Sequence, residues 1–168
     1  MIASNRATIT AAALLAMLPA SAAQAQMPAD PKGLTGVYGG SYICPDGEHG
    51  AMLEVTGVEP HDMANYPYRI SARLAFFPIV SQTWQRLGKV AGSFSMRGTI
   101  AKDGTVRLMP AEWIVEPKGY GWARLEGRFA PRDDGLMAFE GKPQANGGVD
   151  CRGFVATRAL PAMGKGAE

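Results

Sequence analysis

The densest group of ionisable side chains lies in one short segment that ends in glycine, Cys44 to Gly50. Its ionisable members, together with two that follow further along the chain, are Asp46, Glu48, His49, His61 and Asp62. Carboxylates and imidazoles bind divalent metals, so these residues could form a metal site. However, the H-E-x-x-H and paired C-x-x-C spacings are missing, and polar residues are also expected in a turn. We therefore predict a solvated hairpin turn and expect no metal and no other cofactor.

Other catalytic arrangements receive little support. The segment Gly92-Ser93-Phe94-Ser95 lacks the second glycine of a G-x-S-x-G nucleophile motif. Asp133 and Asp134 precede a glycine at a turn, where neighbouring carboxylates point apart rather than facing a substrate. We therefore predict no catalytic residue and a non-catalytic protein. The alternative is an enzyme or a metal-binding protein that uses the segment with Asp46, Glu48 and His49.

Aromatic residues form the other conspicuous group, between Trp113 and Trp122. If Leu125 faces the core, alternation places Trp122 on the opposite face of the strand, together with Arg124. Exposed aromatic rings beside arginine are typical of binding surfaces, whereas the same rings could instead fold inward and cap the core. The predicted ligand- or partner-binding residues are Trp84, Trp113, Tyr120, Trp122 and Arg124.

The first 25 residues have the pattern of a secretory signal peptide. A positive Arg6 precedes an apolar stretch, and the small-residue run ends in an A-x-A cleavage site, Ala23-Gln24-Ala25. The apolar stretch is too short to span a membrane as a helix. We therefore expect a periplasmic or secreted protein. The predicted organisation is a signal peptide at 1–25, an N-terminal tail at 26–35, a β-barrel domain at 36–158 and a C-terminal tail at 159–168.

The chain has two cysteines, Cys44 and Cys151. In an oxidising compartment such a pair forms a disulfide by default. The two residues lie near the start and the end of the predicted domain, so the bond would join its first and last strands. We expect a structural disulfide, because a redox pair would have the C-x-x-C spacing.

Short strands separated by glycine dominate the predicted structure. Apolar and polar residues alternate from Tyr68 to Phe77, which indicates a strand with one buried face. Asp103-Gly104 and Asp134-Gly135 predict hairpin turns. We expect an all-β fold, a closed or nearly closed antiparallel barrel of about eight strands, with one short helix in the insertion at 78–88. An open sandwich is the alternative.

Charge and patterning exclude two classes of partner. The 17 basic and 15 acidic residues nearly balance and form no basic stripe, which argues against nucleic-acid binding. Several strands carry arginine on the face opposite the apolar one, and an outer-membrane barrel would have the reverse pattern. These arginines are Arg69, Arg73, Arg97 and Arg107. We therefore expect no membrane span.

Two faint resemblances support the barrel. The segment Leu34-Thr35-Gly36-Val37-Tyr38 resembles the G-x-W opening of the calycin-like barrels, the lipocalin and avidin type, with tyrosine in place of tryptophan. The spacing of Trp113 to Tyr120, Leu125 to Gly127 and Cys151 to Phe154 is similar to that of poorly characterised secreted bacterial domains. The resemblance implies a small closed barrel and carries over no activity and no ligand residue.

These observations together favour a secreted or periplasmic binding module with an aromatic loop surface. Its partner would be a protein docked on the loops or a small apolar ligand inside the barrel. The large residues predicted to face inward are Tyr68, Phe76, Phe94, Met96 and Phe129. Because they are large enough to fill an eight-stranded barrel, surface recognition is the favoured form of binding.

Overall fold

The computed structural model describes residues 31–45, 47–79, 91–145 and 151–159. One turn of 3-10 helix, η1 (Pro31–Leu34), precedes the strands. The strands are β1 (Gly36–Cys44), β2 (Gly47–Met63), β3 (Tyr66–Pro78), β4 (Gly92–Ile100), β5 (Thr105–Val115), β6 (Ala123–Pro131), β7 (Met137–Ala145) and β8 (Arg152–Arg158).

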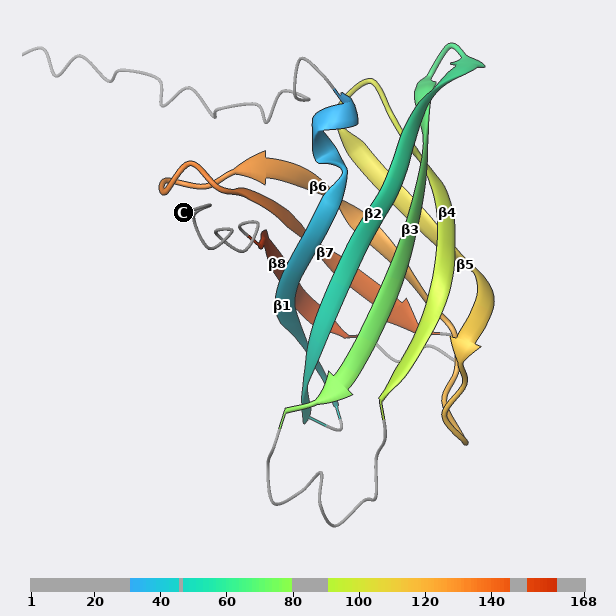
Figure 1. Ribbon diagram of the computed structural model, residues 1–168, viewed down its shortest axis with the longest axis vertical. Helices are drawn as coiled ribbons and strands as arrows, with labels where there is room; N and C mark the ends of the chain where they lie inside the picture. Colours follow the sequence, from blue (N-terminus) through green and yellow to red (C-terminus); the bar gives the residue numbers. More distant parts are fainter. Residues whose placement is uncertain (1–30, 46, 80–90, 146–150, 160–168) are drawn as a thin grey trace, which may run out of the picture.

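The strands form one closed antiparallel barrel in which each strand pairs with the next (Figure 1). The pairing of β1 with β8 closes the ring, with Gly40 opposite Ala156. A Cβ on Gly40 would collide with the carbonyl oxygen of Val155, so glycine lets the first and last strands approach here. Cys44 and Cys151 form a disulfide beside this seam. The predictions of an all-β closed barrel and of this disulfide are confirmed.

The period-two pattern of the sequence places one face of each strand inside the barrel. In β3, Ile70, Ala72, Leu74 and Phe76 are buried, and the residues between them point outward. Phe94 and Phe129 are also buried, as predicted. The largest fully buried side chains are Tyr38, Phe94, Phe139 and Phe154. Aromatic and aliphatic side chains thus pack the barrel interior.

The two Asp-Gly turns share one geometry. The Asp103 carboxylate accepts a hydrogen bond of 2.9 Å from the Thr105 amide, and Gly104 has a φ of 81°. The Asp134 carboxylate accepts a bond of 3.0 Å from the Leu136 amide, and φ of the following glycine is 78°. Only glycine adopts this left-handed conformation without cost, which explains why the same dipeptide recurs.

At the upper end of the barrel in Figure 1, η1 precedes β1 and is held there by side chains of β1 and β8. The Tyr38 hydroxyl donates a buried hydrogen bond of 2.7 Å to the carbonyl of Leu34. The Arg158 guanidinium donates to the carbonyl of Gly33 at 2.9 Å and to that of Thr35. One arginine on the last strand thus ties down the segment that enters the first strand.

Several predictions concern residues outside the described ranges. Pro78, predicted to start a short helix, instead ends strand β3, and residues 80–90, which hold the rest of that predicted helix, lie outside the described residues. The predicted signal peptide and Trp84 lie outside them as well. Within the described ranges, no helix has the length and apolar character needed to cross a membrane.

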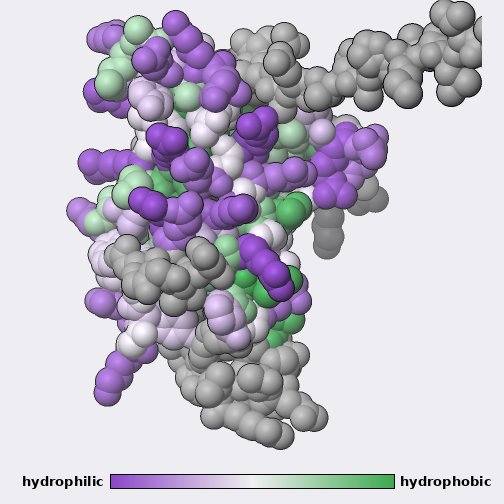
Figure 2. All heavy atoms as spheres, turned by 180° about the vertical axis from the view of Figure 1, so that it is seen from behind, coloured by the Kyte–Doolittle hydropathy of each residue, from purple (hydrophilic) through white to green (hydrophobic). Residues whose placement is uncertain are grey.

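The outer wall carries charged side chains over much of its area. Figure 2 shows hydrophilic residues across most of the face seen from behind. On the outside of β5 and β6, Arg107 and Glu126 form an ion pair of 3.3 Å. The four arginines predicted to face away from the core, at positions 69, 73, 97 and 107, are all exposed.

Candidate functional site

The lower end of the barrel in Figure 1, opposite η1, holds a group of aromatic side chains. The β1–β2 turn, the end of β3, the start of β4 and the β5–β6 connection meet here. Five rings from these elements form what we call the aromatic cluster: Phe76, Phe94, Trp113, Tyr120 and Trp122. Strands β3, β4 and β5 and the β5–β6 connection position them.

Phe76 lies at the centre of one half of the cluster. Its ring stacks on Tyr120 with centroids 5.4 Å apart and an interplanar angle of 27°. Trp113 meets the same ring edge-on at 6.4 Å. Such geometries stabilise aromatic pairs beyond the area they bury. Phe76 is buried while Tyr120 and Trp113 are half-buried, so the cluster runs from the core toward solvent.

The two tryptophans form the other half. The Trp113 and Trp122 rings lie 5.0 Å apart at 35°, and Phe94 contacts Trp113 edge-on at 5.1 Å. Both indoles are half-buried and pack against the buried core. The cluster thus has a buried base of phenylalanine rings and a half-buried margin of indole rings.

A polar pair adjoins the cluster on β1 and β2. The imidazole of His49 stacks on Tyr42 with centroids 4.9 Å apart and an interplanar angle of 15°. Burial lowers the pKa of His49, which therefore stays neutral near pH 7. Burial and, to a lesser extent, the neighbouring Tyr120 raise the pKa of Tyr42, and burial raises that of Tyr120. Both hydroxyls therefore stay protonated and can donate hydrogen bonds among apolar rings.

The predicted solvated turn is wrong for His49. Strand β2 begins at Gly47, so Glu48 points outward and His49 points inward, where it is only 3% exposed. Adjacent strand residues face opposite sides, which separates these two potential metal ligands. His61 lies near the other end of β2, where its Nδ1 is 3.2 Å from the Tyr66 carbonyl oxygen. Among the described residues, which exclude Asp46, no three potential ligands form a group that could hold a metal.

Of the two alternatives for Tyr120 and Trp122, an exposed face and a cap on the core, the structure has the second. Both residues precede β6, which begins at Ala123, so the alternation of that strand does not reach them. Their rings pack against the core, which is the capping alternative. Arg124 is on the outer wall, where its Nε donates to the Oε1 of Gln144. The structure thus brings together Trp113, Tyr120 and Trp122 and leaves Arg124 outside the cluster.

Sequence reasoning overlooked Tyr42 as a site residue and did not connect Phe76 with the site. A signal for Tyr42 was present, because Tyr42 lies on the same side of β1 as Tyr38, which occupies the aromatic position of the motif like G-x-W. Phe76 was predicted to be core, which is correct. Its ring contact with Tyr120 depends on a loop conformation that no periodicity describes.

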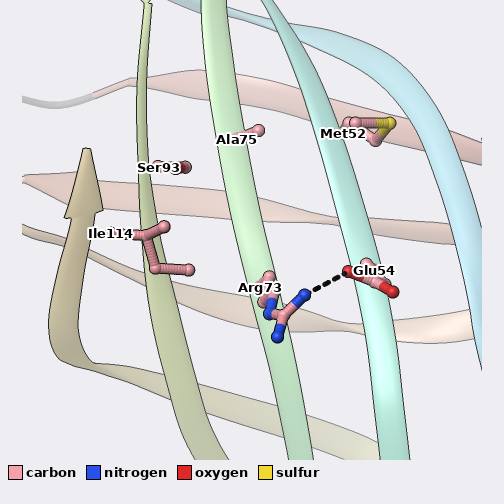
Figure 3. Close-up of a pocket in the computed structure, with 6 residues that line it drawn as sticks. All are labelled: Met52, Glu54, Arg73, Ala75, Ser93 and Ile114. Atoms are coloured by element: carbon pink, nitrogen blue, oxygen red, sulfur yellow. Dashed lines mark ion pairs between the residues drawn. The ribbon is translucent and has the colours of Figure 1, made fainter.

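A second concave region lies on the outer wall, across β2 to β5. Figure 3 shows its lining residues: Met52, Glu54, Arg73, Ala75, Ser93 and Ile114. Arg73 and Glu54 form an ion pair of 3.6 Å at one side, and the bulged residue Ile114 is 54% exposed. The hollow holds about 400 Å³ and opens to solvent. It faces away from the aromatic cluster, since its lining residues point outward from the same strands.

Comparisons with protein-family models, with curated proteins and with solved structures give no match for this chain.

Proposed function

We propose that this protein is a non-catalytic binding module whose site is the aromatic end of the barrel. The convergence of five rings at the end opposite η1 is the observation that carries this proposal. Ligand sites in proteins are mostly apolar and aromatic, with a few polar groups that orient the ligand. Tyr42 and His49 supply such groups beside the cluster.

Packing inside the barrel favours recognition at this end over a deep internal cavity. Phe139 and Phe154 are fully buried and contact each other at 5.6 Å. Phe129 packs on Phe139 at 5.1 Å and on Tyr38 at 5.2 Å. An eight-stranded barrel has room for either side chains or one small ligand, and here side chains take up the middle. The proposed ligand is therefore a small apolar molecule or an exposed apolar group of a protein partner.

A periplasmic or secreted location is part of the same proposal. The Cys44–Cys151 disulfide supports it, because such bonds persist in oxidising compartments. The sequence pattern at residues 1–25 supports export independently. The assignment to calycin-like barrels likewise stays a proposal, carried by Gly36 and Tyr38 at the start of β1.

The test is ligand titration followed by substitution at the site. Intrinsic tryptophan fluorescence reports on the cluster, since Trp113 and Trp122 belong to it. We would titrate indole, p-cresol and octanoate and, in parallel, use the immobilised protein to capture partners from periplasmic extract. Any ligand or partner found is then measured by calorimetry against Trp122→Leu. Tyr68→Leu is the matched control, because Tyr68 is another half-buried aromatic residue that packs on the core, near the opposite end.

Loss of binding in Trp122→Leu with retention in Tyr68→Leu is the expected result. Binding that survives Trp122→Leu but disappears in Ile114→Ser would move the site to the outer hollow and overturn the proposal. Absence of any ligand and of any captured partner would also count against it.

A further inference from the structure

Tyr120 contributes its ring to the aromatic cluster. The ring stacks on Phe76, and the hydroxyl oxygen is buried. Gly119 and Gly121 flank it, and both are exposed. In the described part of the chain, a Cβ added at either glycine would have no atom within 4 Å. The inner side of this loop is therefore packed, whereas the backbone on both sides of the ring faces open space.

Pro117 also holds the loop that carries Tyr120 against the barrel. Pro117 is buried, and a Cβ on Gly92 would come within 2.7 Å of the Pro117 ring and close to Phe76. The Tyr120 amide donates a hydrogen bond of 3.2 Å to the Pro117 carbonyl, which closes a local turn and binds no strand. Gly119 has a φ of 80°, a left-handed conformation that directs the chain back toward the barrel.

The space that the Tyr120 ring fills, which we call the slot, is bordered by an aromatic face and lies near a hydroxyl group. The face of Phe76 forms one wall. Tyr42 stacks on His49 of β2, and β2 pairs with β3 next to Phe76, so a hydroxyl group lies at the same end of the barrel as the slot. A flat ring gains stacking from the wall, and a polar substituent gains a partner in surroundings where an unpaired polar group is costly.

We infer that Tyr120 acts as a built-in occupant of the binding slot, and that the ligand is a planar aromatic ring with a phenol-like hydroxyl that displaces it. This inference rests on the proposed function and gives it a ligand class. The two glycines allow the loop to swing outward without disturbing the strands. The ligand ring then stacks on Phe76, and its hydroxyl approaches Tyr42.

The built-in ring lowers the apparent affinity of the wild-type protein. A ligand binds only the fraction of molecules whose slot is open, so its apparent Kd equals the intrinsic Kd divided by that fraction. Removal of the Tyr120 ring leaves the slot open in every molecule. An apolar cavity of this kind, once emptied, takes up small aromatic molecules.

The experiment compares Tyr120→Ala with the wild-type protein by calorimetric titration of p-cresol and toluene. We expect Tyr120→Ala to bind p-cresol about tenfold or more tightly than the wild type does, because its slot is always open. It should also prefer p-cresol to toluene, and the added substitution Tyr42→Phe should abolish that preference. Equal p-cresol affinity in Tyr120→Ala and the wild type, with both folded, would overturn the inference.

A second variant keeps the tyrosine and covers the case in which Tyr120→Ala fails to fold. Pro117→Ala removes most of the buried ring that lies against Gly92, which should loosen the attachment of the loop and leave Phe76 in place. It should raise p-cresol affinity in the same direction. In the wild type, saturating p-cresol should speed amide hydrogen exchange at residues 119–122. Unchanged affinity in Pro117→Ala together with slowed exchange would contradict displacement.

A second titration tests whether the ligand ring belongs to a free small molecule or to a side chain of a partner protein. A peptide with the sequence of residues 117–121 presents the same phenol on a protein backbone, whereas p-cresol presents it as a free molecule. Tighter binding of the peptide to Tyr120→Ala assigns the slot to an aromatic side chain of a partner protein, and tighter binding of p-cresol assigns it to a small molecule.

If Tyr120→Ala gains no affinity while the wild type still binds a ligand through Trp122, the displacement model alone fails. If Tyr120→Ala gains affinity for p-cresol but the wild type has no ligand or partner, only the proposed function fails.

Discussion

The ring of Tyr42 on β1 and the imidazole of His49 on β2 are register partners that stack inside the barrel at 4.9 Å. Burial lowers the pKa of His49 below its ordinary value of 6.5. The unfolded chain therefore takes up a proton on His49 at a pH where the folded protein does not. As a result, this residue makes the free energy of unfolding fall as pH drops below about 6.5.

His49→Phe should remove that contribution while it keeps a ring on Tyr42. We expect a flatter dependence of unfolding free energy on pH between neutral and mildly acidic conditions, measured by urea denaturation at a series of pH values. His61→Phe is the control, because His61 lies at the other end of β2 and is more exposed. Parallel curves for the wild type and His49→Phe would show that burial does not disfavour the charged imidazole.

Arg158 should contribute more to stability than a typical surface arginine. Its guanidinium donates to the Gly33 carbonyl at 2.9 Å and to the Thr35 carbonyl, and it thereby holds η1 against the barrel. Hydrogen bonds that involve a charged group are worth about 1.5–3 kcal/mol, so Arg158→Ala should lower the free energy of unfolding by about that amount.

Arg107→Ala is the matched control for this substitution. Arg107 forms an exposed ion pair with Glu126 at 3.3 Å, and such pairs contribute about 0–1 kcal/mol. Denaturant titration of both variants compares the two effects directly. Similar losses for Arg158→Ala and Arg107→Ala would show that the contact with η1 adds nothing.

The barrel was predictable because its strands obey a simple rule. Alternation in β3 assigns Leu74 inward and Arg73 outward, and the closed structure agrees. The two Asp-Gly turns were predictable for a similar reason, since the requirement for a left-handed glycine is local. Closure itself follows less directly from sequence, and the disulfide between Cys44 and Cys151 was the strongest indication of it.

The candidate site was less predictable because it depends on where strands begin. Glu48 and His49 are both polar residues of the kind expected in a turn. Because β2 already starts at Gly47, Glu48 is exposed and His49 is buried. Likewise, Trp122 lies just outside β6, and the alternation that would have pointed it outward does not apply. In both places the position of the strand boundary decides whether the alternation of the strand applies to a residue.

The disulfide should stabilise the barrel beside the seam where its ends meet. It joins the end of β1 to the residue before β8 across 107 positions of sequence. Removal of such a cross-link costs about 2–4 kcal/mol, mainly because the unfolded chain gains freedom. A Cys44→Ser, Cys151→Ser variant should therefore unfold at lower urea concentration than the wild type. The variant should not respond to reductant, whereas the wild type should lose the same stability when reduced. A reductant effect on the variant would mean that the loss has another cause.

Trp113 and Trp122 should couple electronically, because their rings lie 5.0 Å apart at a fixed angle of 35°. Coupled indoles give a paired positive and negative band in circular dichroism, and a single indole cannot give one. We therefore expect such a couplet in the wild type and its loss in both Trp113→Phe and Trp122→Phe. Trp84→Phe is the control and should retain it, since the couplet arises from the other two rings. The couplet should also vanish in urea together with the folded state. A couplet that persists in Trp122→Phe would show that the signal arises from another pair of rings, and absence of a couplet in the wild type would contradict the packing of Trp113 on Trp122.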